Sequence, residues 1–126
     1  MGDAIRDRGM LVGLLSVMTI ANLDSPSHLA DALIGLFPAF AGDLHGEEIT
    51  TYHEVLQRLA PRIAEFLHSS SERTVKECSA LVNSMFSNGG DQENAVSTCL
   101  LEHASQIGIR KMIRSHLSNE ARRELR

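Results

Sequence analysis

The chain has 126 residues, of which 43% are hydrophobic and 22% charged, a composition typical of one globular domain and unlike that of a disordered chain. Its net charge of −4 is uneven: residues 109–126 carry six basic and two acidic side chains, whereas the other 108 residues carry six basic and fourteen acidic ones. The acidic body would repel phosphate, and four Phe, one Tyr and no Trp offer little for base stacking. A basic protein is therefore a better expected partner than a nucleic acid.

Residues 10–21 form the first apolar stretch and follow four charged residues of balanced sign, Asp3, Arg6, Asp7 and Arg8. The stretch is shorter than the roughly 20 residues of a membrane span. The balanced charges and the lack of a small-residue cleavage site argue against a secretory signal. We expect a buried first helix in a cytoplasmic protein that has no membrane partner. The alternative is an exposed apolar patch.

The next helix is predicted to begin after residues 22–25. Ser25 followed by Pro26 is typical of an N-cap with proline at the first helical position. One side of this helix is apolar, with Leu29, Leu33, Leu36 and Phe37 at helical spacing. Pro38 should end or bend the helix, residues 39–43 should form one more short turn, and residues 42–46 should link it to the central helix.

The central helix is predicted over residues 47–67. Its apolar residues recur at intervals of 3, 4, 3, 4 and 3, which indicates a helix and not a strand; they are Ile49, Tyr52, Leu56, Leu59, Ile63 and Phe66. Pro61 lacks a backbone N–H and clashes with the preceding turn, so we expect a kink or a break near Leu59 or Ala60. Because the apolar register is the same on both sides, both halves should face one core.

Further helical patterns fill the rest of the chain. Ser70 or Ser71 should cap a helix that ends at Ser87-Asn88-Gly89-Gly90. Asp91 should cap the next helix, which Gly108 would end, and Ser118 should cap a final turn after a short helix. No strand-like alternation occurs. The sequence therefore predicts one all-α domain over residues 1–126, a compact bundle or short stack of about six or seven helices with the central helix kinked near Pro61.

Acidic residues gather where two loops enter helices. Asp43, Glu47 and Glu48 precede or begin the central helix, and Asp91 and Glu93 begin the later one. Carboxylates stabilise helix N-termini, which is one explanation of this pattern. The functional interpretation is a negative patch that speeds association with a basic protein. These five residues are the candidate partner-binding residues.

Motifs for catalysis or cofactor binding are lacking: there is no glycine-rich phosphate loop, paired-cysteine motif, His-Glu-x-x-His or nucleophile elbow. Cys99 and His103 lie one helical turn apart and could share a metal only if Cys78 and His116 approached them. The alternative is that both thiols are small core residues of a reduced protein. His53 could act as a base, although a lone histidine beside an apolar stripe more often packs or caps. We expect no enzymatic activity, no cofactor and no metal.

Five segments carry a resemblance to a known group of proteins: LFPAF (36–40), TYHEVLQRLA (51–60), SNGGD (87–91), ENAV (93–96) and CLLE (99–102). Over about residues 30 to 108 the chain resembles a family of small, all-helical bacterial proteins. Members look like immunity proteins encoded beside polymorphic or contact-dependent toxins. The resemblance implies a protein that binds and neutralises one cognate toxin.

The sequence thus leads to two functional hypotheses. The first is an immunity protein that occludes the active site of a basic toxin domain with a preformed helical surface. The second is a helical adaptor or self-associating structural protein, for example a homodimer formed through residues 10–20. Recovery of a toxin partner would favour the first hypothesis, and a concentration-dependent dimer would favour the second.

Overall fold

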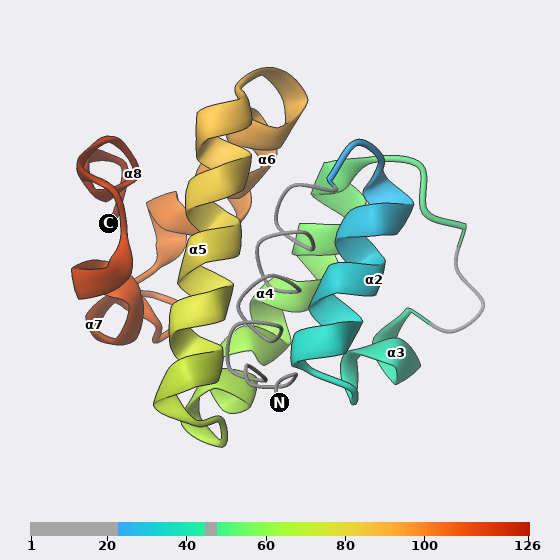
Figure 1. Ribbon diagram of the computed structural model, residues 1–126, viewed down its shortest axis with the longest axis horizontal. Helices are drawn as coiled ribbons and strands as arrows, with labels where there is room; N and C mark the ends of the chain where they lie inside the picture. The colour runs from blue at the N-terminus through green and yellow to red at the C-terminus, as the bar shows by residue number, and fades with distance from the viewer. Residues whose placement is uncertain (1–22, 45–47) are drawn as a thin grey trace, which may run out of the picture.

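The computed structural model describes residues 23–44 and 48–126, and these form helices without any strand (Figure 1). The all-α class is therefore confirmed for the described residues. The expected helix at residues 10–21 lies outside them, as does Glu47. The α-helices are α2 (Pro26–Leu36), α3 (Phe40–Asp43), α4 (Tyr52–His68), α5 (Glu72–Asn88), α6 (Gly90–Cys99), α7 (Arg110–Ile113) and α8 (Asn119–Arg123), with short 3-10 helices at Leu101–His103 and Arg114–His116. None of the helices described has the length and apolar character needed to cross a membrane.

Local capping explains where α2 begins. The Ser25 side chain accepts a hydrogen bond from the His28 backbone N–H at 3.2 Å, and Pro26 occupies the first turn, as predicted. The chain leaves α2 before Pro38 and forms the short α3, which was also predicted. Aromatic packing then holds this region on α4, because the rings of Phe37 and Phe40 lie 5.2 and 6.3 Å from that of Phe66.

The start of α4 differs from the prediction. Residues 48–51 are not helical, and the helix begins at Tyr52 because Thr51 and Glu54 form a capping box. The Thr51 hydroxyl accepts from the Glu54 N–H, and the Glu54 carboxylate accepts from the Thr51 N–H, both at 3.0 Å. This pair satisfies two of the backbone N–H groups that the first turn of a helix leaves without intrahelical partners. The predicted start was therefore wrong.

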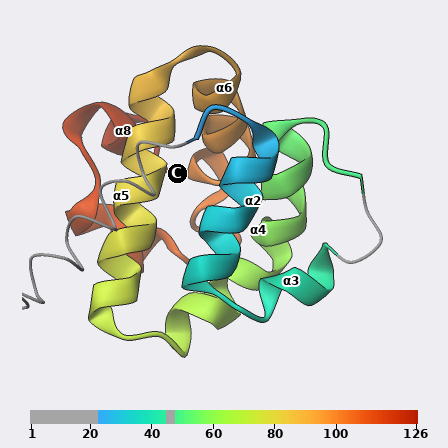
Figure 2. The same ribbon diagram turned by 45° about the vertical axis from the view of Figure 1, so that its right-hand side comes forward.

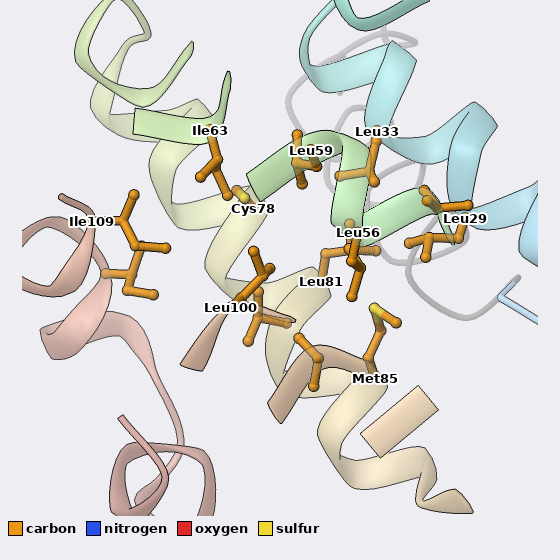
Figure 3. Packing of buried hydrophobic residues seen from close by; sticks show 14 of the residues in the cluster. Leu29, Leu33, Leu56, Leu59, Ile63, Cys78, Leu81, Met85, Leu100 and Ile109 are labelled. Atoms are coloured by element: carbon orange, nitrogen blue, oxygen red, sulfur yellow. The ribbon is translucent and has the colours of Figure 1, made fainter. Parts of the chain in front are cut away.

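Pro61 lies inside α4, which runs unbroken to His68. The alternative of a break near Leu59 or Ala60 is therefore wrong, and a kink in the continuous helix stays a prediction. The predicted apolar stripe is confirmed as core from Leu56 onward: Leu56, Leu59 and Ile63 are each 1% exposed. Its first two residues, Ile49 and Tyr52, are only partly buried. Figure 3 shows these side chains among buried residues from α2 and α5.

The capping box makes the stability of α4 dependent on pH. Hydrogen bonds from the Thr50 backbone and side chain, and then from the Thr51 backbone, hold the pKa of Glu54 below its ordinary value of 4.5. A carboxyl whose folded pKa is lowered stabilises the fold above its unfolded pKa, and this contribution disappears as the pH falls through the folded pKa. We expect Glu54→Gln to unfold at lower urea concentration than the wild type at pH 7. The difference should shrink below about pH 4; a difference that is constant with pH would contradict this role of the charge.

The chain reverses direction between α5 and α6 at two glycines with positive φ, Gly89 at 73° and Gly90 at 57°. Gly89 closes α5 by donating its N–H to the Phe86 carbonyl, and its own carbonyl accepts from the Glu93 N–H to open α6. Asp91 was predicted as the cap of α6, and this was wrong. It lies one residue inside the helix, because the reversal needs a conformation that glycine adopts without strain.

Two glycine substitutions test this account of the reversal. At Gly89 the backbone has φ 73° and ψ −170°, a conformation nearly restricted to glycine, so Gly89→Ala should lower the free energy of unfolding by about 1–3 kcal/mol. Gly35 lies within α2, and an added Cβ would meet nothing within 4 Å. Gly35→Ala should therefore stabilise by about 0.4–1 kcal/mol. Denaturant unfolding measures both changes in the free energy of unfolding. Equal effects of the two substitutions would contradict the role of Gly89 in the reversal.

The helices pack around one buried apolar cluster that includes residues from α2 to the C-terminal segment. α6 packs against both α4 and α5, α2 packs on α4 and α5, and α7 and α8 lie on the side of α5 away from α2 (Figures 1 and 2). α6 ends at Cys99, earlier than predicted, and a 3-10 helix and turns fill residues 101–108. Ser118 caps α8 by accepting from the Ala121 N–H, as predicted. This arrangement gathers the starts of α2, α4 and α6 at one end of the molecule.

Candidate functional site

Two open hollows flank the first turn of α6. The α2–α4 hollow has a volume of about 370 Å³ and is lined by Asp24, Ser25, Pro26, Thr50, Thr51, Tyr52, His53 and Asp91. The α5–α8 hollow has a volume of about 580 Å³ and is lined by Asn83, Phe86, Ser87, Glu93, Ser118 and Glu120. Asp91 and Glu93 are two residues apart and point to different sides of the helix. The first turn of α6 therefore contributes one carboxylate to each hollow.

The electrostatic character of both hollows is negative. Among the described residues they hold four carboxylates, and no lysine or arginine of that part of the chain lines either one. We call these carboxylates, from Asp24, Asp91, Glu93 and Glu120, the acidic face. The Asp24 side chain is 77% exposed and contacts Nδ1 of His28. Within the described residues, Asp91, Glu93 and Glu120 form no ion pair.

The structure brings together only part of the predicted partner-binding set. Asp91 and Glu93 lie on the acidic face. Asp43 ends α3, lines neither hollow, and accepts a hydrogen bond from Arg62 at 2.6 Å. Glu48 is exposed on the segment before α4 and also lines neither hollow, while Glu47 lies outside the described residues. The five residues thus do not form one patch in the described structure.

Sequence reasoning missed two members of the acidic face, Asp24 and Glu120. Both carry the signal that singled out the others, an acid beside the start of a helix: Asp24 precedes the Ser25 cap, and Glu120 follows the Ser118 cap. Asp24 and Glu120 differ from acids at the starts of other helices in that they lie near α6. That proximity depends on tertiary packing and not on local sequence.

The thiols and histidines do not form a reactive centre among the described residues. Burial raises the pKa of the Cys78 thiol to about 12, so this thiol is not a ready nucleophile or metal ligand. Burial also raises the pKa of Cys99, an effect partly opposed by a hydrogen bond with Thr98. His103 pairs with Gln106 at 2.9 Å. In residues 23–44 and 48–126, no group of three or more His, Cys, Asp or Glu side chains could hold a metal ion.

Comparison with protein families gives one match. The model of a domain of unknown function, DUF7674, matches residues 30–126. The chain belongs to this family. No curated protein and no solved structure matches the chain.

The DUF7674 match extends from within α2 to the end of the chain, so it includes Asp91, Glu93 and Glu120 but not Asp24. The family's description names no activity and no partner. The resemblance to immunity proteins therefore stays a prediction.

Proposed function

We propose that this DUF7674 protein is a cytoplasmic, non-enzymatic immunity protein that binds a basic toxin domain through the acidic face. The observation that carries the proposal is the placement of four carboxylates around the first turn of α6, in hollows that no lysine or arginine of residues 23–44 and 48–126 lines. The toxin's cationic active site would lie against this face. Neutralisation is then steric, because a substrate cannot reach a site that helices cover.

A comparison with acids elsewhere in the chain supports the proposal. Asp43 and Glu65 both pair with Arg62, and Glu77 pairs with Arg73. Asp91, Glu93 and Glu120 have no such partner within the described residues, and Asp24 contacts only His28. Like charges that line the same hollow, as Asp24 and Asp91 do, repel one another and do not help the chain to fold. A basic partner would remove this repulsion on binding, so the arrangement is better suited to binding than to stability.

The acidic face would act on both the rate and the specificity of association. Its potential attracts a basic protein from a distance, which raises the association rate at low ionic strength. The helices that carry the acidic face pack on one core, so few side chains and loops need to become ordered when the partner binds. A rigid, negatively charged surface of this kind is suited to rapid capture of one toxin.

The alternative, an adaptor or homodimer formed through residues 10–20, involves residues outside the described part of the structure. Sedimentation velocity over a range of concentrations separates the two hypotheses. The immunity proposal expects a monomer that becomes a heterodimer when the toxin domain is added. The alternative expects a dimer without any added protein.

Cell rescue tests the proposed function directly. The proposed toxin domain is expressed from an inducible promoter in a sensitive host, with this chain expressed from a second plasmid. Survival is expected with the wild-type chain and not with Asp91→Arg/Glu93→Arg at equal soluble protein levels. Death in both cases, or equal survival in both, would contradict neutralisation through the acidic face.

A further inference from the structure

A polar contact joins three segments at the α2–α4 hollow, which Tyr52 lines. The Leu23 carbonyl accepts two hydrogen bonds, one from the Tyr52 hydroxyl at 2.8 Å and one from Nε2 of Gln92 at 2.7 Å. Nε2 of Gln92 also donates to the Tyr52 hydroxyl oxygen at 3.4 Å, and Nδ2 of Asn88 donates to Oε1 of Gln92 at 2.9 Å. Leu23 is only 2% exposed. We call this arrangement, formed by Leu23, Tyr52 and Gln92, the Leu23 clasp.

The clasp is placed where it can set the geometry of the acidic face. Leu23 immediately precedes Asp24, and Gln92 lies between Asp91 and Glu93. Tyr52 is the first residue of α4 and itself lines the hollow. The chain that carries one carboxylate is therefore bonded to the helical turn that carries two others. Movement of Leu23 away from α6 would separate Asp24 from Asp91.

Two donors on one carbonyl give the clasp a specific energetic property. A buried carbonyl that keeps one donor remains satisfied, whereas a carbonyl that loses both bears the full desolvation penalty. Loss of either donor alone should therefore have a small effect, and loss of both should have a larger effect than the two single losses combined. A pair of unrelated packing contacts would not show this coupling.

We infer that Tyr52 and Gln92 are positioning residues that hold Asp24 beside the first turn of α6 through the Leu23 carbonyl. The importance of this role for partner recognition rests on the proposed function. The clasp itself is a property of the free protein. It can therefore be tested without the partner, and its failure can be told apart from failure of the proposed function.

Amide hydrogen exchange on the full chain tests the clasp. The reporters are His28 and Leu29, whose N–H groups bond Ser25 at the start of α2. Tyr52→Phe and Gln92→Met should each speed their exchange by about tenfold or less. The double variant should speed it by more than the product of the two single effects. Simple multiplication of the two effects would overturn the clasp.

Asn83 supplies a matched control, because its side chain also makes two hydrogen bonds between segments. It donates to the His116 carbonyl at 3.0 Å and accepts from the Ser118 N–H at 2.8 Å. Asn83→Ala should speed amide exchange at Ala121, near Ser118. Exchange at His28 and Leu29, measured relative to amides in the middle of α5, should not change. If Asn83→Ala speeds exchange at His28 and Leu29 as much as the Tyr52 and Gln92 variants do, the effect is a general loss of stability. This result would overturn the positioning role.

A third variant keeps the test decisive if the double variant does not fold. In Gln92→Glu a carboxylate would face the Leu23 carbonyl, and two acceptor oxygens repel each other. At pH 7 the His28 amide should therefore lose more protection against hydrogen exchange than in Gln92→Met. Lowering the pH through the glutamate range, about 4, restores a donor to this side chain. Protection relative to the wild type should then return. No recovery at low pH would overturn the hydrogen-bonding role of Gln92.

Discussion

Replacing Leu56 with alanine is expected to lower the free energy of unfolding by about 2–5 kcal/mol. Leu56 lies on the inner side of α4 and is 1% exposed, among core residues contributed by α2 and α5 (Figure 3). The substitution removes buried methyl groups and leaves a cavity that the surrounding helices can fill only in part. Urea or guanidinium unfolding followed by circular dichroism measures the change.

The adjacent Gln57 provides the control for this substitution. Gln57 is exposed on the same helix, and alanine is a good helix former, so Gln57→Ala should change the free energy of unfolding by no more than about 0.5 kcal/mol. A loss below about 1 kcal/mol for Leu56→Ala would show that the stripe on α4 does not carry the core.

Reversing one charge on the acidic face is expected to weaken binding of the toxin domain by roughly 10- to 100-fold, the range for a charged residue at the centre of an interface. Asp91→Arg makes this change at the first turn of α6, where the carboxylate is exposed and free of ion pairs within the described residues. The difference in affinity between wild type and variant should become much smaller as the salt concentration rises, because salt screens exposed charges. Titration calorimetry at two salt concentrations gives both quantities.

Glu72→Arg is the matched control, since Glu72 is also an exposed acid in the first turn of a helix. It begins α5, at the end of that helix away from the turn that leads into α6 (Figure 1), and lines neither hollow. Its reversal alters the net charge by the same amount, so it should reduce affinity by less than about threefold. Similar losses for both variants would indicate attraction by net charge alone.

Local signals allowed much of the fold to be predicted from the sequence. The Ser25, Ser71 and Ser118 caps and the apolar stripe of α4 each depend on residues three or four positions apart, so they can be read without tertiary information. The start of α4 was placed too early because Ile49 continues the apolar spacing, although Thr51 and Glu54 provide the stronger signal. Asp91 resembled a cap, but the glycine reversal before it determined where α6 begins.

The candidate site was less predictable, because it is made by packing between helices. Acids at helix starts were recognised as candidates, yet the sequence did not show which starts meet in space. Asp43 was singled out although Arg62 pairs with it, and Asp24 was missed although it shares a hollow with Asp91. The Leu23 clasp joins residues 69 positions apart, a separation at which spacing rules carry no information.

Co-purification from the native host at moderate salt shows whether the acidic face binds a basic toxin domain in the cell. The wild-type chain and Asp91→Arg/Glu93→Arg are tagged and processed side by side. Mass spectrometry identifies the proteins retained by each. The account predicts a stoichiometric basic partner with a toxin domain on the wild-type chain and its loss from the variant. A wild-type chain that emerges alone or only as its own dimer, or a partner retained equally by both chains, would contradict it.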